Sequence, residues 1–381
     1  MRILHIISST NPLGGGPIEG IKQLSRAMCE LGVKVEVVSC DAPDAPWLAS
    51  SGLNIHAVGP GLLKYGYARR LVPWLREHAG RYDAVIVNGI WQYHALAAWR
   101  VLSQSDTPYF VFTHGMLDPW FKRQYPLKHL KKWFYWPWGD YRVLRDARAV
   151  IFTCEEERLL ARQSFWLYRV NEVVASYGTA SPPPGDVTPF LNEWSELQNR
   201  RVILFLSRIH EKKGCDLLLE AFARVAAEDD SLHLVMAGPA ELRLLTALKT
   251  EARRLKIESR ITWAGMLEGD AKWAAFRLAE VLCLPSHQEN FGIVVAEALA
   301  CGTPVLISNK VNIWREIESD RAGFVGDDSV DGTERSLRRW MGLDQGERAE
   351  MGARALHCFE SRFQAHRAGE RLIEIIRENT Q

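Results

Sequence analysis

Short apolar runs alternate with stretches of helical periodicity along most of the chain. Between the runs, apolar residues recur at helical spacing, as at Ile21, Leu24 and Met28. Strands that alternate with helices in this way are typical of a parallel sheet covered by helices on both faces. The predicted strands are residues 2–8, 33–38, 82–88, 109–113, 149–153 and 172–176 and, after an interruption, 201–206, 232–237, 260–264, 281–284 and 303–307.

A cluster of chain-breaking residues causes this interruption. Residues 181–186 read Ser-Pro-Pro-Pro-Gly-Asp, and such a density of proline and glycine indicates a loop or linker. The strand and helix rhythm restarts at Arg201. We therefore predict two α/β domains with their boundary near this cluster.

Composition is that of a globular protein. Of the 381 residues, 47% are hydrophobic and 24% are charged, and the formal net charge is +1, so attraction to a bulk polyanion is not indicated. Seven cysteines without C-x-x-C spacing suggest free thiols in a reducing compartment. No apolar run approaches the ~20 residues that span a bilayer, and Met1-Arg2 lead directly into a strand rather than a secretion signal. We expect a cytoplasmic protein.

Residues 281–308 form a predicted strand–loop–helix–loop–strand unit that carries two glutamates. Glu289 precedes the predicted helix 293–300. Glu297 lies inside it among apolar residues, where a carboxylate needs a partner or a ligand. For an isolated glutamate, a partly exposed side chain in a simple salt bridge is the alternative. The spacing corresponds to about 12 Å of helix, longer than the about 5–9.5 Å between glycosidase carboxylates, and it suits two ends of an extended ligand.

The segment from Glu289 to Glu297 reads E-N-F-G-I-V-V-A-E and is followed by A-L-A-C-G-T-P-V. It resembles the E-x7-E signature of the retaining glycosyltransferases of family 4. The resemblance implies the GT-B fold, in which two doubly wound, Rossmann-like α/β domains face each other across a cleft. The implied divisions are an acceptor-side domain at 1–183, a nucleotide-sugar-binding domain at 184–360 and a helix at 361–381 that returns to the first domain.

The resemblance also implies retaining transfer of a sugar from a nucleotide-sugar to an acceptor hydroxyl, without a metal or other cofactor. Arg208 and Lys213 follow a predicted strand and match the family's clamp for the donor diphosphate, with a solvated basic loop as the alternative. Glu297 is implied to bind the ribose and Glu289 the sugar. The other implied donor-binding residues are Gly238, Gly265, Asn290, Phe291 and Gly292.

A glycine-rich turn follows the first predicted strand. A dinucleotide fingerprint beginning at Gly14 would need a third glycine where Glu19 stands, so nicotinamide binding is not supported. A helix N-terminus still suits an anion, and the resemblance implies that Gly15 and Gly16 approach the donor diphosphate; a turn that only needs flexible glycines is the alternative. His114 ends the fourth predicted strand and matches the family's histidine near the reacting sugar carbon, although a lone histidine is more often structural.

Residues 120–142 combine basic and aromatic side chains at an unusual density. This mixture is typical of a segment that lies on an anionic membrane. A buried aromatic cluster is the main alternative, and the net charge argues against nucleic acid. We predict that the segment contacts the inner face of the plasma membrane and a lipid-linked or glycan acceptor through Lys128, Lys131, Lys132, Trp133 and Trp136.

The implied role is synthesis of exopolysaccharide, O-antigen or a related surface glycan. Two alternatives stay open. One is another nucleotide-sugar enzyme of the same fold, such as an epimerase or a phosphorylase, and the other is a non-catalytic, membrane-bound binding subunit.

Overall fold

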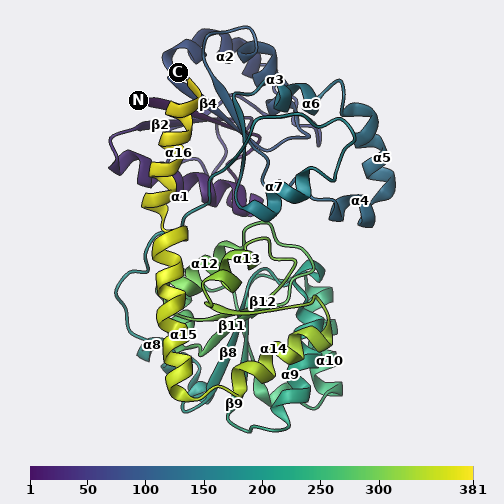
Figure 1. Cartoon of the computed structure of the whole chain (residues 1–381), viewed down its shortest axis with the longest axis vertical. Coiled ribbons are helices and arrows are strands. Elements are labelled where there is room, and N and C mark those ends of the chain that lie inside the picture. Colours follow the sequence, from purple (N-terminus) through teal and green to yellow (C-terminus); the bar gives the residue numbers. More distant parts are fainter. Residues whose placement is uncertain (381) are drawn as a thin grey trace. The chain divides into compact units, whose positions relative to one another are not determined.

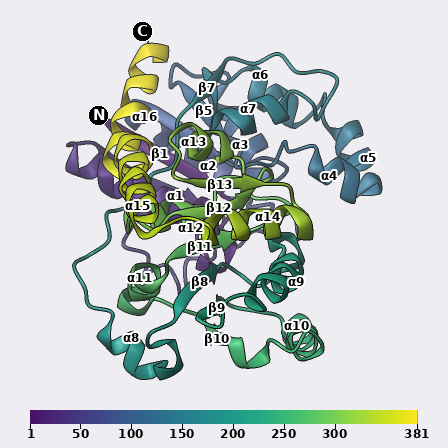
Figure 2. The same cartoon turned by 60° about the horizontal axis from the view of Figure 1, so that its bottom comes forward.

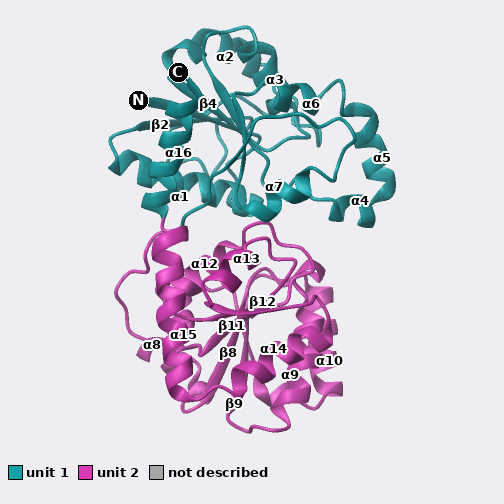
Figure 3. Cartoon of the chain, in the orientation of Figure 1, with its two compact units in different colours: residues 1–179, 365–381 teal, residues 180–364 magenta. Residues whose placement is uncertain are grey.

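The computed structural model of the chain describes residues 1–380. The chain divides into two compact units (Figure 3), of which unit 1 comprises Met1–Thr179 and Ala365–Gln381 and unit 2 comprises Ala180–Gln364. The chain passes from unit 1 to unit 2 after Thr179 and returns to unit 1 after Gln364. Both positions lie within a few residues of the boundaries implied by the sequence, 183/184 and 360/361. Each unit is described by itself below.

Unit 1 is built on a seven-stranded parallel sheet with the order β3-β2-β1-β4-β5-β6-β7. The chain leaves β1 on one side and returns to β4 on the other, so the strand order reverses between these two strands. Ligands of open α/β sheets bind beyond the carboxyl ends of the strands at such a reversal. The strands are β1 (Arg2–Ile7), β2 (Lys34–Ser39), β3 (Ile55–Ala57), β4 (Ala84–Asn88), β5 (Tyr109–Phe112), β6 (Ala149–Phe152) and β7 (Glu172–Val174).

Helices cover both faces of this sheet. The C-terminal helix packs across the first helix of the chain (Figure 1), and Gly369 allows this close packing because a Cβ there would lie 3.3 Å from the Cβ of Ala27. The helices are α1 (Gly16–Glu30), α2 (Leu71–His78), α3 (Tyr93–Leu102), α4 (Trp120–Gln124), α5 (Pro126–Tyr135), α6 (Asp140–Arg145), α7 (Glu155–Ala161) and α16 (Ala365–Thr380), with single 3-10 turns at Pro12–Gly14 (η1) and Ala79–Arg81 (η2).

Unit 2 is built on a six-stranded parallel sheet with the order β10-β9-β8-β11-β12-β13, which reverses between β8 and β11. The strands are β8 (Arg201–Leu206), β9 (Leu232–Ala237), β10 (Ile261–Gly265), β11 (Val281–Leu284), β12 (Val305–Ser308) and β13 (Gly323–Gly326).

The helices of unit 2 form two layers. In Figure 2, α9, α10 and α14 lie on one side of the sheet and α11, α12 and α15 on the other. The helices are α8 (Thr188–Glu193), α9 (Cys215–Ala226), α10 (Leu242–Arg254), α11 (Gly269–Leu278), α12 (Ile293–Ala300), α13 (Trp314–Ser319), α14 (Val330–Met341) and α15 (Gln345–Cys358), with shorter turns at Ser195–Leu197 (η3), Glu211–Lys213 (η4), Glu258–Arg260 (η5) and Phe359–Phe363 (η6).

The core strands are the continuous apolar runs on which the fold prediction rested. Strands such as β4 and β11 are buried along their whole length, as expected for parallel strands covered on both faces. The two doubly wound sheets confirm the predicted α/β architecture. The edge strands β3 and β13 were not predicted. Three residues are too few to show a pattern in β3, and glycines at both ends of β13 leave only Phe324 and Val325 as an apolar run.

Two predictions from composition concern the whole chain. All seven cysteines are free thiols in the structure. Within residues 1–380, no helix is both long and apolar enough to cross a membrane.

Candidate active site

The loop after β8 carries the predicted cations of unit 2. Arg208 is exposed and forms no ion pair with any carboxylate of the described residues, whereas Lys213 ends the 3-10 turn η4. Gly214 follows with φ 65°, and a Cβ at this position would lie 2.2 Å from the carbonyl oxygen of Pro285. Only glycine therefore lets the start of α9 approach the end of β11 this closely.

An ion pair between Lys213 and Glu289 joins the loops after β8 and β11. Its side chains are only 13% and 19% exposed. Burial, together with the neighbouring cations Arg208 and Lys212, lowers the pKa of Lys213 to about 8, while the Glu289 carboxylate opposes this shift. Two of the predicted residues are thus in direct contact at the carboxyl ends of adjacent strands.

The loop that carries Glu289 is held by backbone hydrogen bonds to the loop after β12. The Glu289 amide donates to the Lys310 carbonyl at 2.9 Å, and the Glu289 carbonyl accepts from the Asn312 amide at 3.0 Å. Phe291 is buried edge-on against Phe363, with ring centroids 5.5 Å apart. The loop is therefore anchored before α12 begins, which keeps Glu289 in place.

Glu297 lies on α12 and is buried, at 8% exposure. Its carboxylate forms an ion pair with Lys272 Nζ of α11 at 2.8 Å, and Lys272 also lies 4.5 Å from the centroid of the Trp273 ring. The partner that a buried carboxylate requires is therefore present within the protein. Sequence reasoning missed Lys272, because spacing in the chain does not show that α11 and α12 meet.

The two glycines predicted near the nucleotide also meet. The Gly238 amide donates to the Gly265 carbonyl at 2.6 Å, beyond the ends of β9 and β10. A Cβ at Gly238 would lie 1.9 Å from the Ser207 carbonyl oxygen. Gly238 therefore packs against the same β8 loop that carries Arg208.

In unit 1, His114 follows β5 in the left-handed region, with φ 51°. Its Nδ1 contacts the Tyr177 hydroxyl, and its Nε2 lies 3.3 Å from Asn88 Oδ1. Burial, then the nearby His5 and His94, lower the pKa of His114. The imidazole is therefore neutral at physiological pH, and Asn88 Oδ1 can only accept, which assigns the proton to Nε2.

Asn88 links three histidines at the end of β4. Its side-chain nitrogen Nδ2 lies 3.1 Å from His5 Nδ1, and its backbone carbonyl oxygen lies 2.9 Å from His94 Nε2. Burial lowers the pKa of both His5 and His94 to about 4. Sequence reasoning singled out His114 alone, since its neighbours come from three different strands and helices.

Glu157 of α7 is a second residue that sequence reasoning missed. It is buried, and its carboxylate accepts four hydrogen bonds. Two come from Thr113 Oγ1 and the Gly115 amide, at 2.7 and 2.6 Å, on either side of His114. The other two come from the amide and hydroxyl of Thr153, both at 2.7 Å. Glu157 therefore shapes the turn that presents His114.

The predicted glycines of the first turn begin α1. Gly15 has φ 77°, which disfavours any side chain, and Gly16 is the first residue of the helix. A Cβ at either position would find open space. Both glycines are exposed, but the Gly15 amide donates to the Pro12 carbonyl at 3.1 Å, so the Gly16 amide at the start of α1 is the better candidate donor to an anion.

The basic and aromatic segment forms α4, α5 and α6, with Pro137 after the end of α5. On α5 the apolar residues Leu127, Leu130 and Phe134 are exposed, at 82%, 52% and 64%. They recur at helical spacing and form one stripe on the solvent side. Lys131 and Trp133 are exposed beside this stripe.

Trp136 corrects the predicted membrane and acceptor set. Its side chain is fully buried, stacks on Phe165 with ring centroids 4.3 Å apart and donates its indole N–H to the Leu167 carbonyl at 2.6 Å. It belongs to the core of unit 1, because a large ring with a satisfied polar atom gains most from burial. It cannot touch a membrane or an acceptor.

Within the described residues, no group of three or more histidine, cysteine, aspartate or glutamate side chains is arranged to hold a metal ion.

Two family models match the chain. The model described as "Glycosyl transferases group 1" matches residues 188–357, and the model described as "Glycosyl transferase 4-like domain" matches residues 15–178. Together they cover most of both units.

Known proteins resemble the chain along most of its length. A D-inositol 3-phosphate glycosyltransferase from Geodermatophilus obscurus is 28% identical over 80% of this chain and 74% of its own, while other curated relatives are matched over less than half of their length. The fold is similar to that of Anabaena HepE, solved with UDP-glucose (TM-score 0.78, 16% identity, 99% of this chain and 100% of that one). It also resembles WaaG, a glycosyltransferase involved in lipopolysaccharide biosynthesis (TM-score 0.67, 16% identity, 98% and 99%).

We predict that Glu157→Gln destabilises unit 1. The carboxamide keeps one acceptor oxygen and turns an N–H group toward donors, so two hydrogen bonds to a charged group are lost. At about 1.5 kcal/mol each, the free energy of unfolding should fall by about 3 kcal/mol. Urea unfolding measures this change. The control is Glu156→Gln, on the same helix but only half-buried, and equal stabilities of the two variants would contradict the role of Glu157.

Proposed function

The chain belongs to the group 1 glycosyltransferases with the GT-B fold, and we propose that it transfers a sugar from a nucleotide-sugar donor to an acceptor hydroxyl with retention of the anomeric configuration. The observation that carries this proposal is the set of charged residues in the loops after β8 and β11 and on α11 and α12. The nucleotide-sugar class is supported by the UDP-glucose complex of the structural neighbour HepE.

The departing nucleoside diphosphate develops negative charge, so stabilising that charge is the main catalytic need. Arg208 is exposed and unpaired within the described residues, and Lys213 is a buried cation held by Glu289. The diphosphate binds Arg208 and Lys213. Lys213 then contacts both the diphosphate and the Glu289 carboxylate. The amides of Asn290 to Gly292 and the Glu289 carboxylate orient the sugar.

Glu297 accepts hydrogen bonds from the ribose hydroxyls, with Lys272 keeping the carboxylate charged. In unit 1, the neutral His114 donates a hydrogen bond from its Nε2–H group to the sugar near the reacting carbon. Before the sugar binds, Asn88 Oδ1 accepts this hydrogen bond. The Gly16 amide, at the exposed start of α1, adds to the stabilisation of the diphosphate, and Gly15 lets the turn approach it. The acceptor attacks on the face from which the diphosphate departs, without an enzyme nucleophile.

The acceptor we propose is a lipid-linked glycan at the inner face of the plasma membrane, in the synthesis of a surface polysaccharide. The exposed apolar stripe of α5 beside Lys131 supports this choice, as does the likeness to WaaG. A second candidate is a soluble phosphorylated polyol, because the relative from Geodermatophilus obscurus acts on D-inositol 3-phosphate by its name. An epimerase, a phosphorylase or a non-catalytic subunit would show no transfer to either acceptor.

We predict that Arg208→Ala and Lys213→Ala each slow sugar transfer while the protein stays folded. One lost contact to developing charge raises the barrier by about 2.7–4 kcal/mol, a rate loss of about 10²–10³-fold. Turnover of UDP-, GDP- and ADP-sugars by the purified protein is the measurement. Arg243→Ala, on the surface of α10 in the same unit, is the control. Wild-type rates in both clamp variants would remove the clamp from the mechanism.

We predict that EDTA leaves activity unchanged, because Arg208 and Lys213 neutralise the diphosphate that a divalent ion would otherwise bind. The measurement compares initial rates with EDTA, with added Mg²⁺ and with Mn²⁺. Loss of activity on chelation, restored by either ion, would show that the reaction needs a metal.

We predict that the protein binds anionic liposomes through the outer side of α5. Each basic residue near an anionic surface contributes about 1 kcal/mol, and exposed apolar side chains add burial in the interface. Flotation at low salt should recover the wild type, while the double variant Leu130→Ser, Lys131→Glu should stay unbound. Leu242→Ser, at a leucine of unit 2 that is 78% exposed against 52% for Leu130, is the control. If the wild type also ignores the liposomes, the acceptor is soluble.

A further inference from the structure

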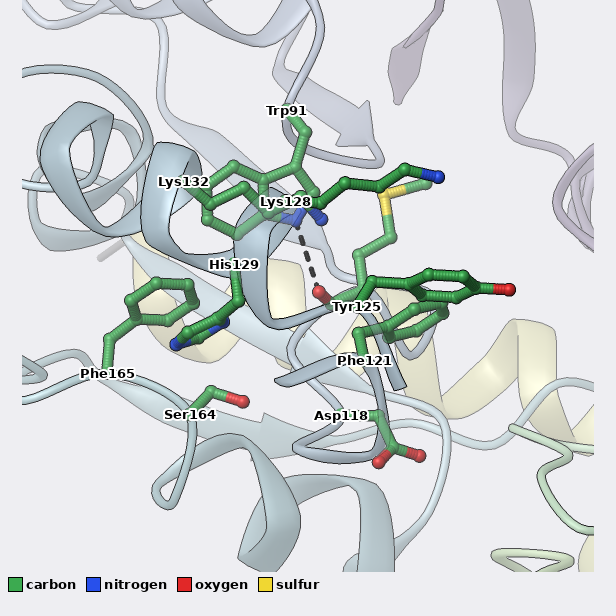
Figure 4. Close-up of a pocket in the computed structure, with 10 residues that line it drawn as sticks. Trp91, Asp118, Phe121, Tyr125, Lys128, His129, Lys132, Ser164 and Phe165 are labelled. Carbon is green, nitrogen blue, oxygen red and sulfur yellow. Dashed lines mark hydrogen bonds between the residues drawn. The ribbon is translucent and has the colours of Figure 1, made fainter. Parts of the chain in front are cut away.

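A pocket of about 60 Å³ lies in unit 1 between α5 and the loops that follow β4, β5 and α7. Figure 4 shows Lys128, His129 and Lys132 of α5 facing this space together with aromatic rings, with Asp118 and Ser164 on the far side from Trp91. The volume is enough for several waters, since one water needs about 10–15 Å³ by this measure. The lining residues are Trp91, Met116, Asp118, Phe121, Tyr125, Lys128, His129, Lys132, Ser164 and Phe165.

Lys132 is a half-buried cation that has no carboxylate in ion-pair contact among residues 1–380. Its Nζ lies 4.3 Å from the centroid of the Trp91 ring and 5.7 Å from that of Phe121. Burial lowers its pKa to about 8, although the charge of Asp140 acts on Lys132 from a distance and partly opposes this lowering. Ring faces compensate only part of the lost hydration of an ammonium group, so the site favours the arrival of an anion.

The acids nearby are engaged by the backbone. Asp118 accepts a hydrogen bond from the Trp120 amide at 2.7 Å. Both oxygens of the buried Asp140 lie 3.2 Å from the Trp91 amide, and burial raises the pKa of Asp140 to about 7. Neither reaches Lys132 as an ion-pair partner within the described structure.

The helix α5 is amphipathic in the reverse of the usual sense. Lys128, His129 and Lys132 face the pocket, whereas Leu127 and Phe134 point to solvent. A surface helix normally buries its apolar side. This arrangement suits a ligand whose anionic group enters the pocket while the outer side of α5 contacts an apolar environment.

We propose that this pocket binds a phosphate group of the acceptor. The proposal rests on the glycosyltransferase function above and deepens it. Lys128 and Lys132 supply point charges to the phosphate oxygens, His129 gains a proton beside the dianion, and the rings of Trp91 and Phe121 line the exit for the rest of the acceptor. The phosphate could belong to a lipid carrier at the membrane or to a soluble polyol phosphate, since both present the same group.

The test compares binding of matched probes to the full-length protein and its variants. The soluble arm uses D-myo-inositol 3-phosphate and unphosphorylated myo-inositol in calorimetry. The membrane arm uses neutral vesicles carrying farnesyl phosphate, or oleate at equal charge, in co-sedimentation. Lys132→Met keeps the apolar stem and removes the charge, and Lys34→Met is the control because Lys34 is an exposed lysine of β2 in the same unit and does not line the pocket.

We expect the wild type and Lys34→Met to prefer one phosphorylated probe over its unphosphorylated match, and Lys132→Met to lose at least tenfold in affinity for that probe. The arm that shows the effect identifies the source of the phosphate. The proposal is overturned if neither phosphorylated probe is preferred, or if Lys132→Met binds as well as the wild type. Binding of UDP, measured on the same samples, reports separately on the donor site, so retained UDP binding would leave the proposed function intact.

Discussion

A charged side chain withdrawn from water must find an opposite charge, and the candidate donor site of unit 2 is built around this constraint. Lys213 with Glu289 and Lys272 with Glu297 form two ion pairs near the carboxyl edge of one sheet. Removing one partner of a buried pair costs about 3–5 kcal/mol. The pairs therefore keep four charged groups in place before any ligand binds, and in the proposed mechanism a bound diphosphate or ribose extends this network.

Unit 1 meets the same requirement with neutral groups. His5, His94 and His114 surround Asn88, and burial keeps all three rings unprotonated. Glu157 is a buried carboxylate in this region, and four short hydrogen bonds compensate its charge. The two units thus present different electrostatics: unit 2 offers cations suited to a leaving diphosphate, and unit 1 offers neutral donors and acceptors suited to sugar hydroxyls.

The segment from α4 to α6 does not follow this pattern of compensated charges, because aromatic rings rather than an ion-paired carboxylate lie beside Lys132. Its helix α5 also exposes leucine and phenylalanine. Both features cost stability in the free protein. An anionic, partly apolar ligand would compensate both costs, because its charge would pair with Lys132 and its apolar part would cover the exposed side chains of α5. The membrane proposal and the phosphate proposal both assume such a ligand.

The sequence by itself determined the α/β architecture and one chemical signature. Parallel strands covered on both faces must be continuous apolar runs, so runs such as 84–88 and 281–284 predicted the two sheets. The spacing of Glu289 and Glu297 could be interpreted because both residues lie in one strand–loop–helix unit. Contacts between residues that are distant in the chain could not be predicted from the sequence. In unit 2, Lys272 reaches Glu297 only through helix packing. In unit 1, Asn88 and Glu157 come close to His114 only through strand order and packing. Composition could not tell the buried Trp136 from the exposed Trp133. Tertiary structure decided these points, because burial and pairing depend on which elements meet.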